Sequence, residues 1–491
     1  MRSGAMLRSL FLLSCCAVLT ACGGGGGSPT TPTPPAAGAG ATNPAGVATI
    51  FGTVTGFGSV IIDGTRVQSH GTLPSVRKED GSAAPVELKL GHVVRASHDG
   101  NLVARSIEVL PVARGPVDKV NAAAGTLTML GQVIAINTDP KAGPVTVFEA
   151  PYTKLADIKV GDVIQVHGLV RIDSAGRSTL QATRIEQKPA ESLHRASGIV
   201  SELSASAKTF RIGSLVVDYA SATLAPAGAT IENGTEVRVS FPGGLPAAGT
   251  AVKATVVIVT EHGKEEGNRE SVAGGAVSAV DAMAKTLTVG GVRIDASTAA
   301  FPQAGKSLAD VKVGTYVVVK GVYTGTAAMK ASSIILRGAD GDSEGHVELH
   351  GTILDFASNA NFMLRDVRVN ASAANINLAA CGGGTQLANG MQVEVKGTLA
   401  ATGEVKATLV KCVPAKDGDT TVARNGTAGK VDVAAKTFVL TGDKGTTLVQ
   451  WNDKTLFVRA EAASLDGKKL VVEGTMSKNV LQASKIVLAE R

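Results

Sequence analysis

The stretch GAVSAVDAMAKTLTVGGVRID, residues 275–295, decides the fold. Residues 286–289 (TLTV) and 292–294 (VRI) alternate apolar with polar side chains, which is typical of strands that bury one face. The two glycines between them favour a tight hairpin turn, because such a turn needs positive φ angles. Residues 275–280 can form a further strand before the hairpin. This stretch therefore predicts the first three strands of a small β-domain.

The residues that follow complete a five-stranded unit. Residues 307–314 (SLADVKVG) predict a short turn or a single helical turn, and 316–322 and 327–336 predict two more strands. Five twisted strands in a unit of about 65 residues fit a small, partly closed barrel that is similar to an OB-fold. Closure removes the exposed edges that valine-rich strands would otherwise present. We therefore expect an all-β fold.

The unit recurs, and two glycines mark each copy. The first landmark is a glycine shortly before a branched residue: Gly52, Gly115, Gly198, Gly275, Gly351 and Gly429. The second is a glycine before an alternating strand: Gly91, Gly161, Gly234, Gly314, Gly390 and Gly467. Their separation stays between 36 residues (198 to 234) and 46 residues (115 to 161). This spacing predicts six tandem β repeats, at residues 47–111, 112–190, 194–260, 272–337, 346–414 and 424–491. The polar stretches 261–271 and 338–345 read as solvated linkers between repeats.

The fourth copy also resembles a known bacterial family. Its motif L-x-D-V-K-V-G followed by V-x-V-x-G, at residues 308–321, is similar to the domain of unknown function 5666 family, as are the initial G-x-V and the TLTV strand. The resemblance covers most of residues 47–490, and copies two and four match best. Copies three, five and six keep only the glycine of the D-V-K-V-G element. The resemblance implies a β-rich lipoprotein of the cell envelope and implies no activity.

The first 22 residues predict export and lipidation. Arg2 and Arg8 precede a short apolar segment, which is too short to span a bilayer. Residues 19–22 (LTAC) resemble the lipobox of bacterial lipoproteins, which implies a signal peptide at 1–21 and a lipid on Cys22. An ordinary secretory signal with a stray cysteine is the alternative. The residue after Cys22 is Gly23 rather than an aspartate, so the resemblance implies sorting to the outer membrane, on its periplasmic or its cell-surface face. Residues 22–46, rich in Gly, Pro and Thr, predict a disordered tether.

Two cysteines remain in the predicted mature chain besides Cys22. Cys381 and Cys412 both fall in the fifth copy. Two thiols in one small domain of an oxidising compartment usually pair, so we predict a disulfide between them. The alternative is two free buried thiols.

The composition argues against several functions. The chain has 48 basic and 42 acidic residues, one tryptophan and four tyrosines, which is a poor basis for nucleic-acid binding through stacking aromatics in a basic groove. The G-x-S-x-G match at 341–345 lies in an acidic linker rather than between a strand and a helix. An S-x-x-K match at 75–78 lacks its companion motifs. We assign no catalytic residue and no cofactor, and we expect no enzyme.

One strand carries metal-ligand chemistry. His346, Glu348 and His350 alternate, so they would share one face of a strand, and imidazole and carboxylate suit Zn²⁺. Neighbouring same-face positions lie about 7 Å apart, so all three can hardly reach one ion. We therefore assign no metal site here and keep a polar face beside a linker as the simpler interpretation.

These observations favour a lipid-anchored envelope protein that works as a non-enzymatic scaffold or binding array of repeated barrels. Its expected partners are the membrane, through the lipid on Cys22, and an envelope protein or glycan. A repeat protein that binds envelope polysaccharide or metal is the alternative. An enzyme would need one copy to carry a site that the others lack.

Overall fold

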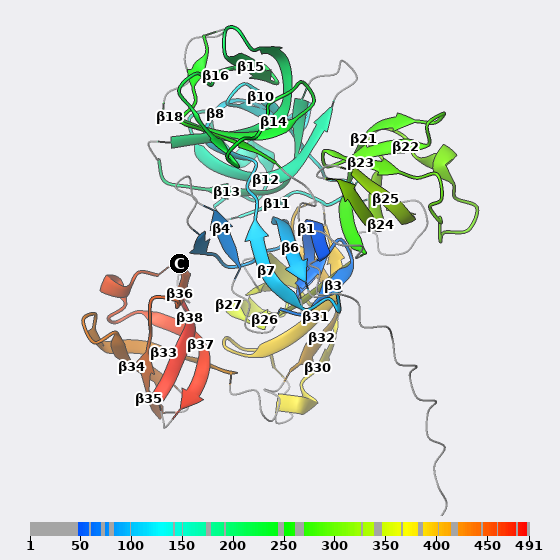
Figure 1. Ribbon diagram of the computed structural model, residues 1–491. Coiled ribbons are helices and arrows are strands. Elements are labelled where there is room, and N and C mark those ends of the chain that lie inside the picture. Colours follow the sequence, from blue (N-terminus) through cyan, green and yellow to red (C-terminus); the bar gives the residue numbers. More distant parts are fainter. Residues whose placement is uncertain are drawn as a thin grey trace, which may run out of the picture. The chain divides into compact units, whose positions relative to one another are not determined.

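The computed structural model describes residues 48–57, 60–69, 74–77, 83–98, 100–140, 143–149, 151–172, 178–190, 193–243, 250–260, 270–325, 328–337, 346–364, 367–381, 386–400, 402–413, 421–442, 445–458, 460–477 and 480–488 (Figure 1). Almost all of its regular structure is β, with only short 3₁₀ turns between strands. Within these residues no helix is long and apolar enough to cross a bilayer. The predicted signal peptide, Cys22 and the tether lie outside the described residues.

The second copy shows how the strands close into a ring. Its elements are β8 (Ala113–Asn121), β9 (Thr126–Met129), β10 (Gln132–Ile136), β11 (Val147–Phe148), η2 (Leu155–Asp157), β12 (Val163–Ile172) and β13 (Ser178–Gln187). β8 pairs antiparallel with β9, β9 with β10, β13 with β12, and β12 with β8. β10 runs parallel to β13, so the chain must cross between them, and η2 lies in that crossing. The result is a closed five-stranded barrel with strand order 1-2-3-5-4, which confirms the OB-like prediction.

The same ring can be traced six times through the described residues, and we number the barrels 1 to 6 along the chain. Barrel 1 comprises β1 (Ala48–Phe57), β2 (Val60–Ile62), β3 (Thr65–Val67), β4 (Ser75–Arg77), β5 (Ala83–Pro85), β6 (Val93–His98) and β7 (Ala104–Val109). Barrel 3 comprises β14 (Leu193–Ser204), β15 (Thr209–Ile212), β16 (Leu215–Asp218), β17 (Thr223–Ala225), β18 (Glu236–Pro242), β19 (Val252–Lys253) and β20 (Val256–Val259). Barrel 4 comprises β21 (Ser271–Asp281), β22 (Thr286–Val289), β23 (Val292–Asp295), η3 (Leu308–Asp310), β24 (Tyr316–Gly325) and β25 (Ala328–Leu336).

Barrels 5 and 6 have the same pairing. Barrel 5 comprises β26 (His346–Thr352), β27 (Leu354–Ser358), β28 (Asn361–Leu364), β29 (Val367–Asn370), β30 (Asn375–Asn377), η4 (Ala379–Cys381), β31 (Gln392–Leu399) and β32 (Val405–Cys412). Barrel 6 comprises β33 (Thr421–Asp432), β34 (Thr437–Gly442), β35 (Gly445–Gln450), β36 (Leu456–Val458), η5 (Ala462–Ser464), β37 (Lys469–Ser477) and β38 (Val480–Leu488).

The second glycine landmark has a backbone reason. All six of these glycines adopt a φ between +73° and +92°, a region in which a Cβ is strained. Each also donates its N–H, at 2.8–2.9 Å, to a carbonyl on the first strand of its barrel or, in barrel 5, directly after it: Val54, Val117, Val200, Val277, Ile353 and Ala428. In the first five copies that acceptor is the predicted branched residue of the first landmark. In barrel 6 it is Ala428, so the first landmark there is Gly426 and the prediction of Gly429 was wrong by three residues.

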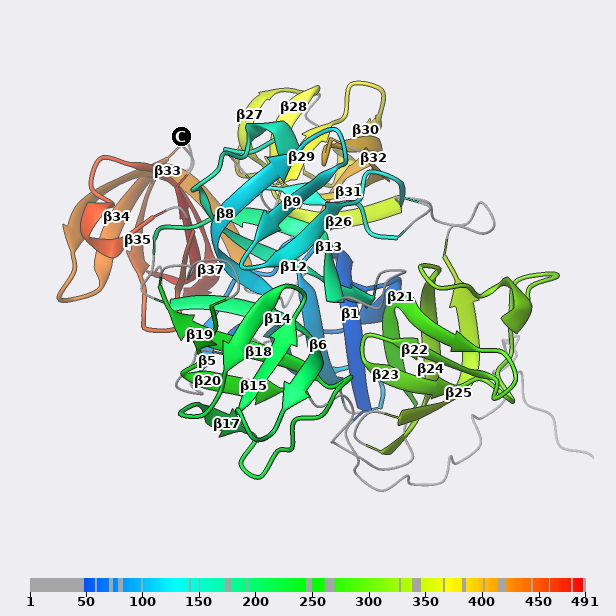
Figure 2. The same ribbon diagram turned by 90° about the horizontal axis from the view of Figure 1, so that it is seen from above.

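The barrels pack against one another, and residues 45–491 form one compact unit. β1 of barrel 1 pairs in parallel with β21 of barrel 4, through Ile50 and Val272, and contacts β26 of barrel 5 at Gly56 (Figure 2). Barrels 1 and 5 share one hydrophobic core, and barrels 2 and 3 share another. Neighbouring barrels therefore supply core contacts that an aromatic-poor unit of this size lacks alone.

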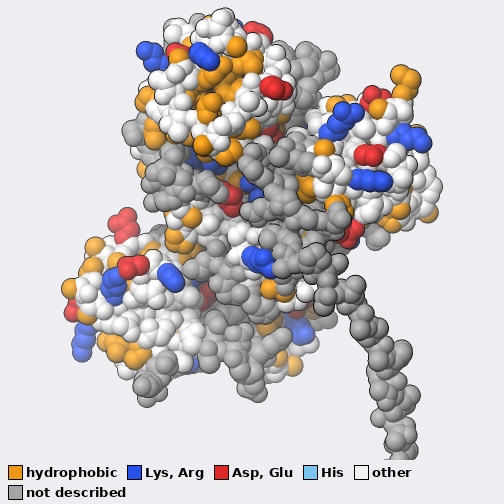
Figure 3. Space-filling model, viewed as in Figure 1, with side chains coloured by type: hydrophobic (Ala, Val, Ile, Leu, Met, Phe, Trp, Pro, Cys, Tyr) orange, Lys and Arg blue, Asp and Glu red, His pale blue; other side chains and the backbone are white. Residues whose placement is uncertain are grey.

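On the face seen in Figure 3, charged side chains of both signs are interspersed.

Candidate functional site

A cavity of about 350 Å³ lies where barrels 1, 2, 4 and 5 meet. Most of its wall is aliphatic and comes from Val54, Ile61, Leu90, Pro140, Pro144, Val145, Val147, Val347 and Leu399. Polar side chains enter it from Thr53, Thr55, Asp63, Tyr316, Arg337, Glu348 and Lys396. A mostly apolar cavity with a few converging polar groups is the usual form of a small-molecule site.

Asp63 is the most unusual group in this cavity. It occupies the turn between β2 and β3, beside Gly64, and only 4% of its surface is exposed. Its Oδ1 accepts a hydrogen bond from the Tyr316 hydroxyl at 2.7 Å, and its Oδ2 accepts one from the Thr53 N–H at 3.1 Å. Arg337 Nη2 donates to the Asp63 carbonyl oxygen at 2.8 Å. Burial raises the pKa of the Asp63 carboxyl to about 6, although these neighbours favour its charged form.

Glycines make room for this contact between barrels 1 and 4. A Cβ on Gly52 or on Gly274 would collide with the Asp63 carboxylate. A Cβ on Gly143, from barrel 2, would come within 2.7 Å of the Tyr316 ring. The glycine of the first landmark in barrel 1 therefore serves the joint between barrels as well as its own strand.

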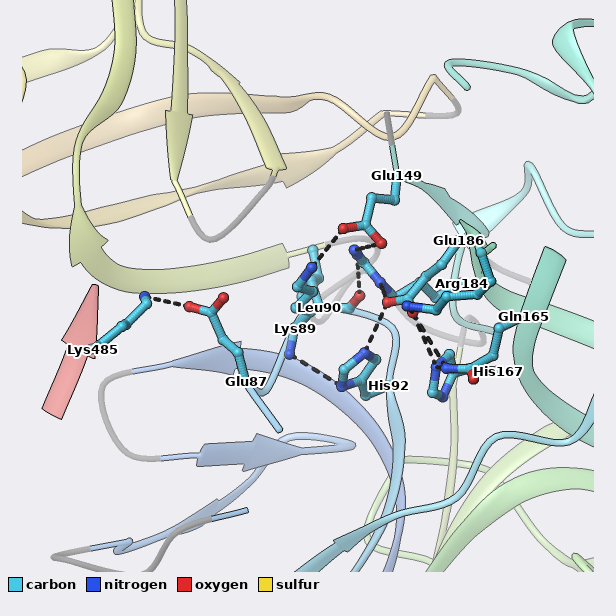
Figure 4. Close-up of polar contacts among 11 residues, drawn as sticks. Glu87, Lys89, Leu90, His92, Glu149, Gln165, His167, Arg184, Glu186 and Lys485 are labelled. Carbon is cyan, nitrogen blue, oxygen red and sulfur yellow. Dashed lines mark hydrogen bonds and ion pairs between the residues drawn. The ribbon is translucent and has the colours of Figure 1, made fainter. Parts of the chain in front are cut away.

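A second buried polar cluster joins barrels 1 and 2 (Figure 4). Glu186 on β13 accepts hydrogen bonds from Arg184 Nε at 2.6 Å and from His92 Nε2 at 3.2 Å. Arg184 is fully buried and also reaches Glu149 at 3.1 Å and the Leu90 carbonyl oxygen at 3.3 Å. Burial alone would raise the pKa of Glu186, but Arg184 and the two nearby histidines hold it well below its usual value. The cluster is therefore an ionised carboxylate paired with a buried guanidinium.

Two histidines complete this cluster. The rings of His92 and His167 stack at 4.3 Å between centroids, and His167 Nε2 lies 3.8 Å from Glu186. Burial lowers the pKa of both rings, so both are neutral at pH 7.

The buried cluster has two imidazoles and a carboxylate close enough for a metal ion, but its hydrogen bonds do not fit one. The Lys89 N–H donates to His92 Nδ1 at 3.3 Å, which makes Nδ1 an acceptor and leaves the ring proton on Nε2. That proton points at Glu186, where a metal would have to bind. Arg184 adds a positive charge to the same carboxylate oxygen. These groups therefore form a structural hydrogen-bond network.

Glu348 and His350, which alternate along the strand discussed in the sequence analysis, lie close to a third group on the neighbouring strand. Glu348 and His350 on β26 lie 3.3 Å apart, and His350 Nε2 lies 3.8 Å from Glu394 on the neighbouring strand β31. The three groups could hold a metal ion. Glu348 is also bound by both oxygens to Arg66, at 2.9 and 3.0 Å, and Lys396 lies 3.1 Å from Glu394. The third group comes from across the sheet because His350 and Glu394 are cross-strand partners, which a single-strand pattern cannot reveal. Nothing is described of the His346 side chain.

Barrel 6 is joined to barrels 1 and 5 by charged groups. Lys485 forms an ion pair with Glu87 of barrel 1 (Figure 4). The Thr352 hydroxyl of barrel 5 donates to Glu473 at 2.6 Å.

The predicted cysteine pair falls in barrel 5. Cys412 is buried at the end of β32, and Cys381 ends η4, which packs against β32. Nothing is described of the Cys381 side chain, so the disulfide stays a prediction. Cys22, the linker residues 261–269 and 338–345, and with them the G-x-S-x-G match, lie outside the described residues, and Ser75 begins the short strand β4.

Sequence reasoning missed Asp63, Tyr316 and Arg337, as well as His92, His167 and Glu186. A weak signal existed for Asp63, since an Asp-Gly turn favours a hairpin, but the partner Tyr316 is 253 residues away. No local pattern connects two such positions.

Comparison with protein families finds three matching segments. Residues 114–186, 274–335 and 350–411 each match the family described as "Domain of unknown function (DUF5666)". They correspond to barrels 2, 4 and 5, so the fifth copy matches even though it lacks the D-V-K-V-G element. Comparison with curated proteins finds no match. The chain is thus a tandem-repeat protein with domains of the DUF5666 family.

Proposed function

We propose that this protein is a non-enzymatic, lipid-anchored component of the bacterial cell envelope whose barrels form one scaffold or binding array. The observation that carries the proposal is the chemistry of the joints. Asp63 with Tyr316, and Glu186 with His92, are buried polar pairs that join different barrels. Separating the barrels would expose apolar core and would remove a hydrogen bond from each buried carboxylate, at a cost of about 1.5–3 kcal/mol each. A chain built this way holds its barrels in a set arrangement, which a scaffold requires.

Anchoring rests on the sequence. The LTAC box at 19–22 supports lipidation of Cys22, and the following 22–46 segment supports a spacer between membrane and barrels. Two or more acyl chains make a stable anchor, whereas one chain is marginal. A spacer of this length would let the assembly meet partners at some distance from the membrane.

The test is photo-crosslinking in a Gram-negative host, comparing the wild-type chain with a Cys22→Ser form after membrane fractionation. We expect wild type in the outer-membrane fraction with one dominant protein adduct, and we expect the Cys22→Ser form to lose both. An unchanged fractionation of the Cys22→Ser form would contradict anchoring. Adducts with glycan or lipid alone would contradict a protein scaffold and favour the binding array.

Metal binding is the second candidate, and the Glu348–His350–Glu394 cluster favours it. Burial lowers the pKa of His350, so its ring is neutral and ready to bind, and all three groups are partly exposed. Arg66 and Lys396 oppose it, because they already balance the two carboxylates. Calorimetric titration of the metal-stripped full chain with Zn²⁺, beside a Glu394→Gln variant, tests whether the cluster binds metal. Binding heat that disappears in the variant supports the metal site, and a flat titration of the wild type rules it out.

A further inference from the structure

We propose that the cavity between barrels 1, 2, 4 and 5 binds a single aliphatic chain of about twelve carbons that carries a neutral or zwitterionic head group. A monoacyl envelope lipid has this chemistry. The inference rests on the cavity alone and does not depend on the anchoring proposed above.

The size of the cavity sets the length of the chain. A volume of about 350 Å³ holds about twelve groups of the size of water, at about 30 Å³ each, and a methylene group is of similar size. Ligand cavities in proteins typically begin at about 300 Å³. The space is therefore too large for a packing defect and fits one medium-length chain.

The wall of the cavity selects an aliphatic ligand. Val54, Leu90, Val145, Val347 and Leu399 are buried aliphatic side chains from three different barrels. This aliphatic part of the wall offers no partners for ordered water, and an empty apolar space weakens the packing around it. Among the described residues of the wall, Tyr316 is the only aromatic one, and its hydroxyl donates a hydrogen bond to Asp63. A flexible chain suits this wall better than a ring that needs a stacking partner.

The charges on the wall select the head group. Lys396 and Glu348 lie 3.8 Å apart and are partly exposed, with 49% and 20% of their side chains accessible. Each has a second partner of opposite charge, Glu394 for Lys396 and Arg66 for Glu348, so this edge of the cavity carries two charges of each sign. Asp63 and Arg337, which also line the cavity, carry opposite charges as well. Paired charges of opposite sign complement a zwitterion or a neutral group, whereas a purely anionic head would also face Glu348. The exposed pair therefore marks where the head group sits.

Binding is tested on the full chain carrying Cys22→Ser, which cannot receive the predicted lipid. The probe is a radiolabelled lysophospholipid with a twelve-carbon chain and a phosphoethanolamine head, below its micelle concentration, in equilibrium dialysis. Two comparison probes are the chain-free head group and the twelve-carbon fatty acid. Ile61→Trp fills the cavity, and Ile231→Trp, at a partly buried isoleucine of barrel 3, is the matched control.

We expect one saturable site per chain, no binding of the head group alone, and at least tenfold weaker binding of the fatty acid. Ile61→Trp should weaken binding at least tenfold, and Ile231→Trp should not change it. If Ile61→Trp fails to fold, a substitution at the exposed Lys396, Lys396→Gln, replaces it. This change should weaken binding of the zwitterionic lysophospholipid without affecting the binding of a further probe, the uncharged twelve-carbon alcohol. Absence of saturable binding, or full binding by a folded Ile61→Trp protein, overturns the site. Equal or tighter binding of the fatty acid overturns the head-group class.

Discussion

Replacing Arg184 by methionine should loosen the joint between barrels 1 and 2 more than any surface substitution. Arg184 is fully buried, and its guanidinium donates to Glu186 at 2.6 Å. The variant Arg184→Met keeps the apolar stem of the side chain but leaves Glu186 charged and buried, with Lys188 at 2.8 Å as its remaining cation. Breaking a buried ion pair from one side costs about 3–5 kcal/mol. The cost arises mainly from the carboxylate that stays behind.

The double variant Arg184→Met/Glu186→Met separates this cause from lost packing. Removing both charges leaves neutral groups such as His92 Nε2–H without an acceptor, at a cost of about 1–3 kcal/mol. The charged groups that lose a partner, Glu149 and Lys188, are partly exposed, so water can solvate them. The double variant should therefore be more stable than Arg184→Met alone. Arg211→Met is the control, because Arg211 pairs with Glu202 on the exposed surface, where a pair contributes about 1 kcal/mol or less.

Hydrogen exchange followed by mass spectrometry measures the joint directly. Peptides covering β6 and β13 report its opening, and peptides of β33 to β38 in barrel 6 serve as an internal reference. A loss of about 3–5 kcal/mol speeds exchange by about two to three and a half orders of magnitude, since 1.4 kcal/mol is tenfold. An effect of Arg184→Met no larger than that of Arg211→Met would refute the reasoning. A double variant less stable than Arg184→Met would refute it as well.

Three further predictions concern pH, a glycine and the cysteines. Burial lowers the pKa of His92 and His167 in the folded state, so the unfolded chain takes up protons first as the pH falls below 6.5. The joint between barrels 1 and 2 should then lose up to about 1.4 kcal/mol of stability per pH unit for each histidine. Hydrogen exchange of β6 and β13 peptides at pH 7.5 and pH 5.5 measures this loss, and equal protection at the two pH values contradicts it. Gly274→Ala forces a Cβ against the Asp63 carboxylate and should cost about 1–3 kcal/mol in thermal unfolding, while Gly429→Ala, whose Cβ meets nothing within 4 Å, should cost less than that. Replacing the two cysteines of barrel 5 by serine should lower the stability of that barrel by about 2–5 kcal/mol, and a native chain in which both thiols can be alkylated would contradict the bridge.

Local chemistry explains most of what was predictable about the fold. Gly290 and Gly291 adopt φ values of +54° and +77°, as a two-residue hairpin turn between alternating strands requires. The second glycine landmark was visible in all six copies because each of these positions has a positive φ, which strains a residue with a Cβ and favours glycine. The first landmark was misplaced in barrel 6, where Gly426 and Gly429 both precede branched or small residues. Only the hydrogen bond from Gly467 to Ala428 distinguishes them.

The sequence by itself determined a chain of small β-barrels, because strand alternation and turn glycines act over a few residues. Only the tertiary structure decided which residues of different copies meet. The carboxylate of Asp63 reaches Tyr316, and Arg184 of barrel 2 reaches the Leu90 carbonyl oxygen of barrel 1. These contacts depend on the packing of one barrel surface on another, so their partners lie about 90 to 250 residues apart in the chain. The cavity has the same origin, because no single copy contains more than part of its wall.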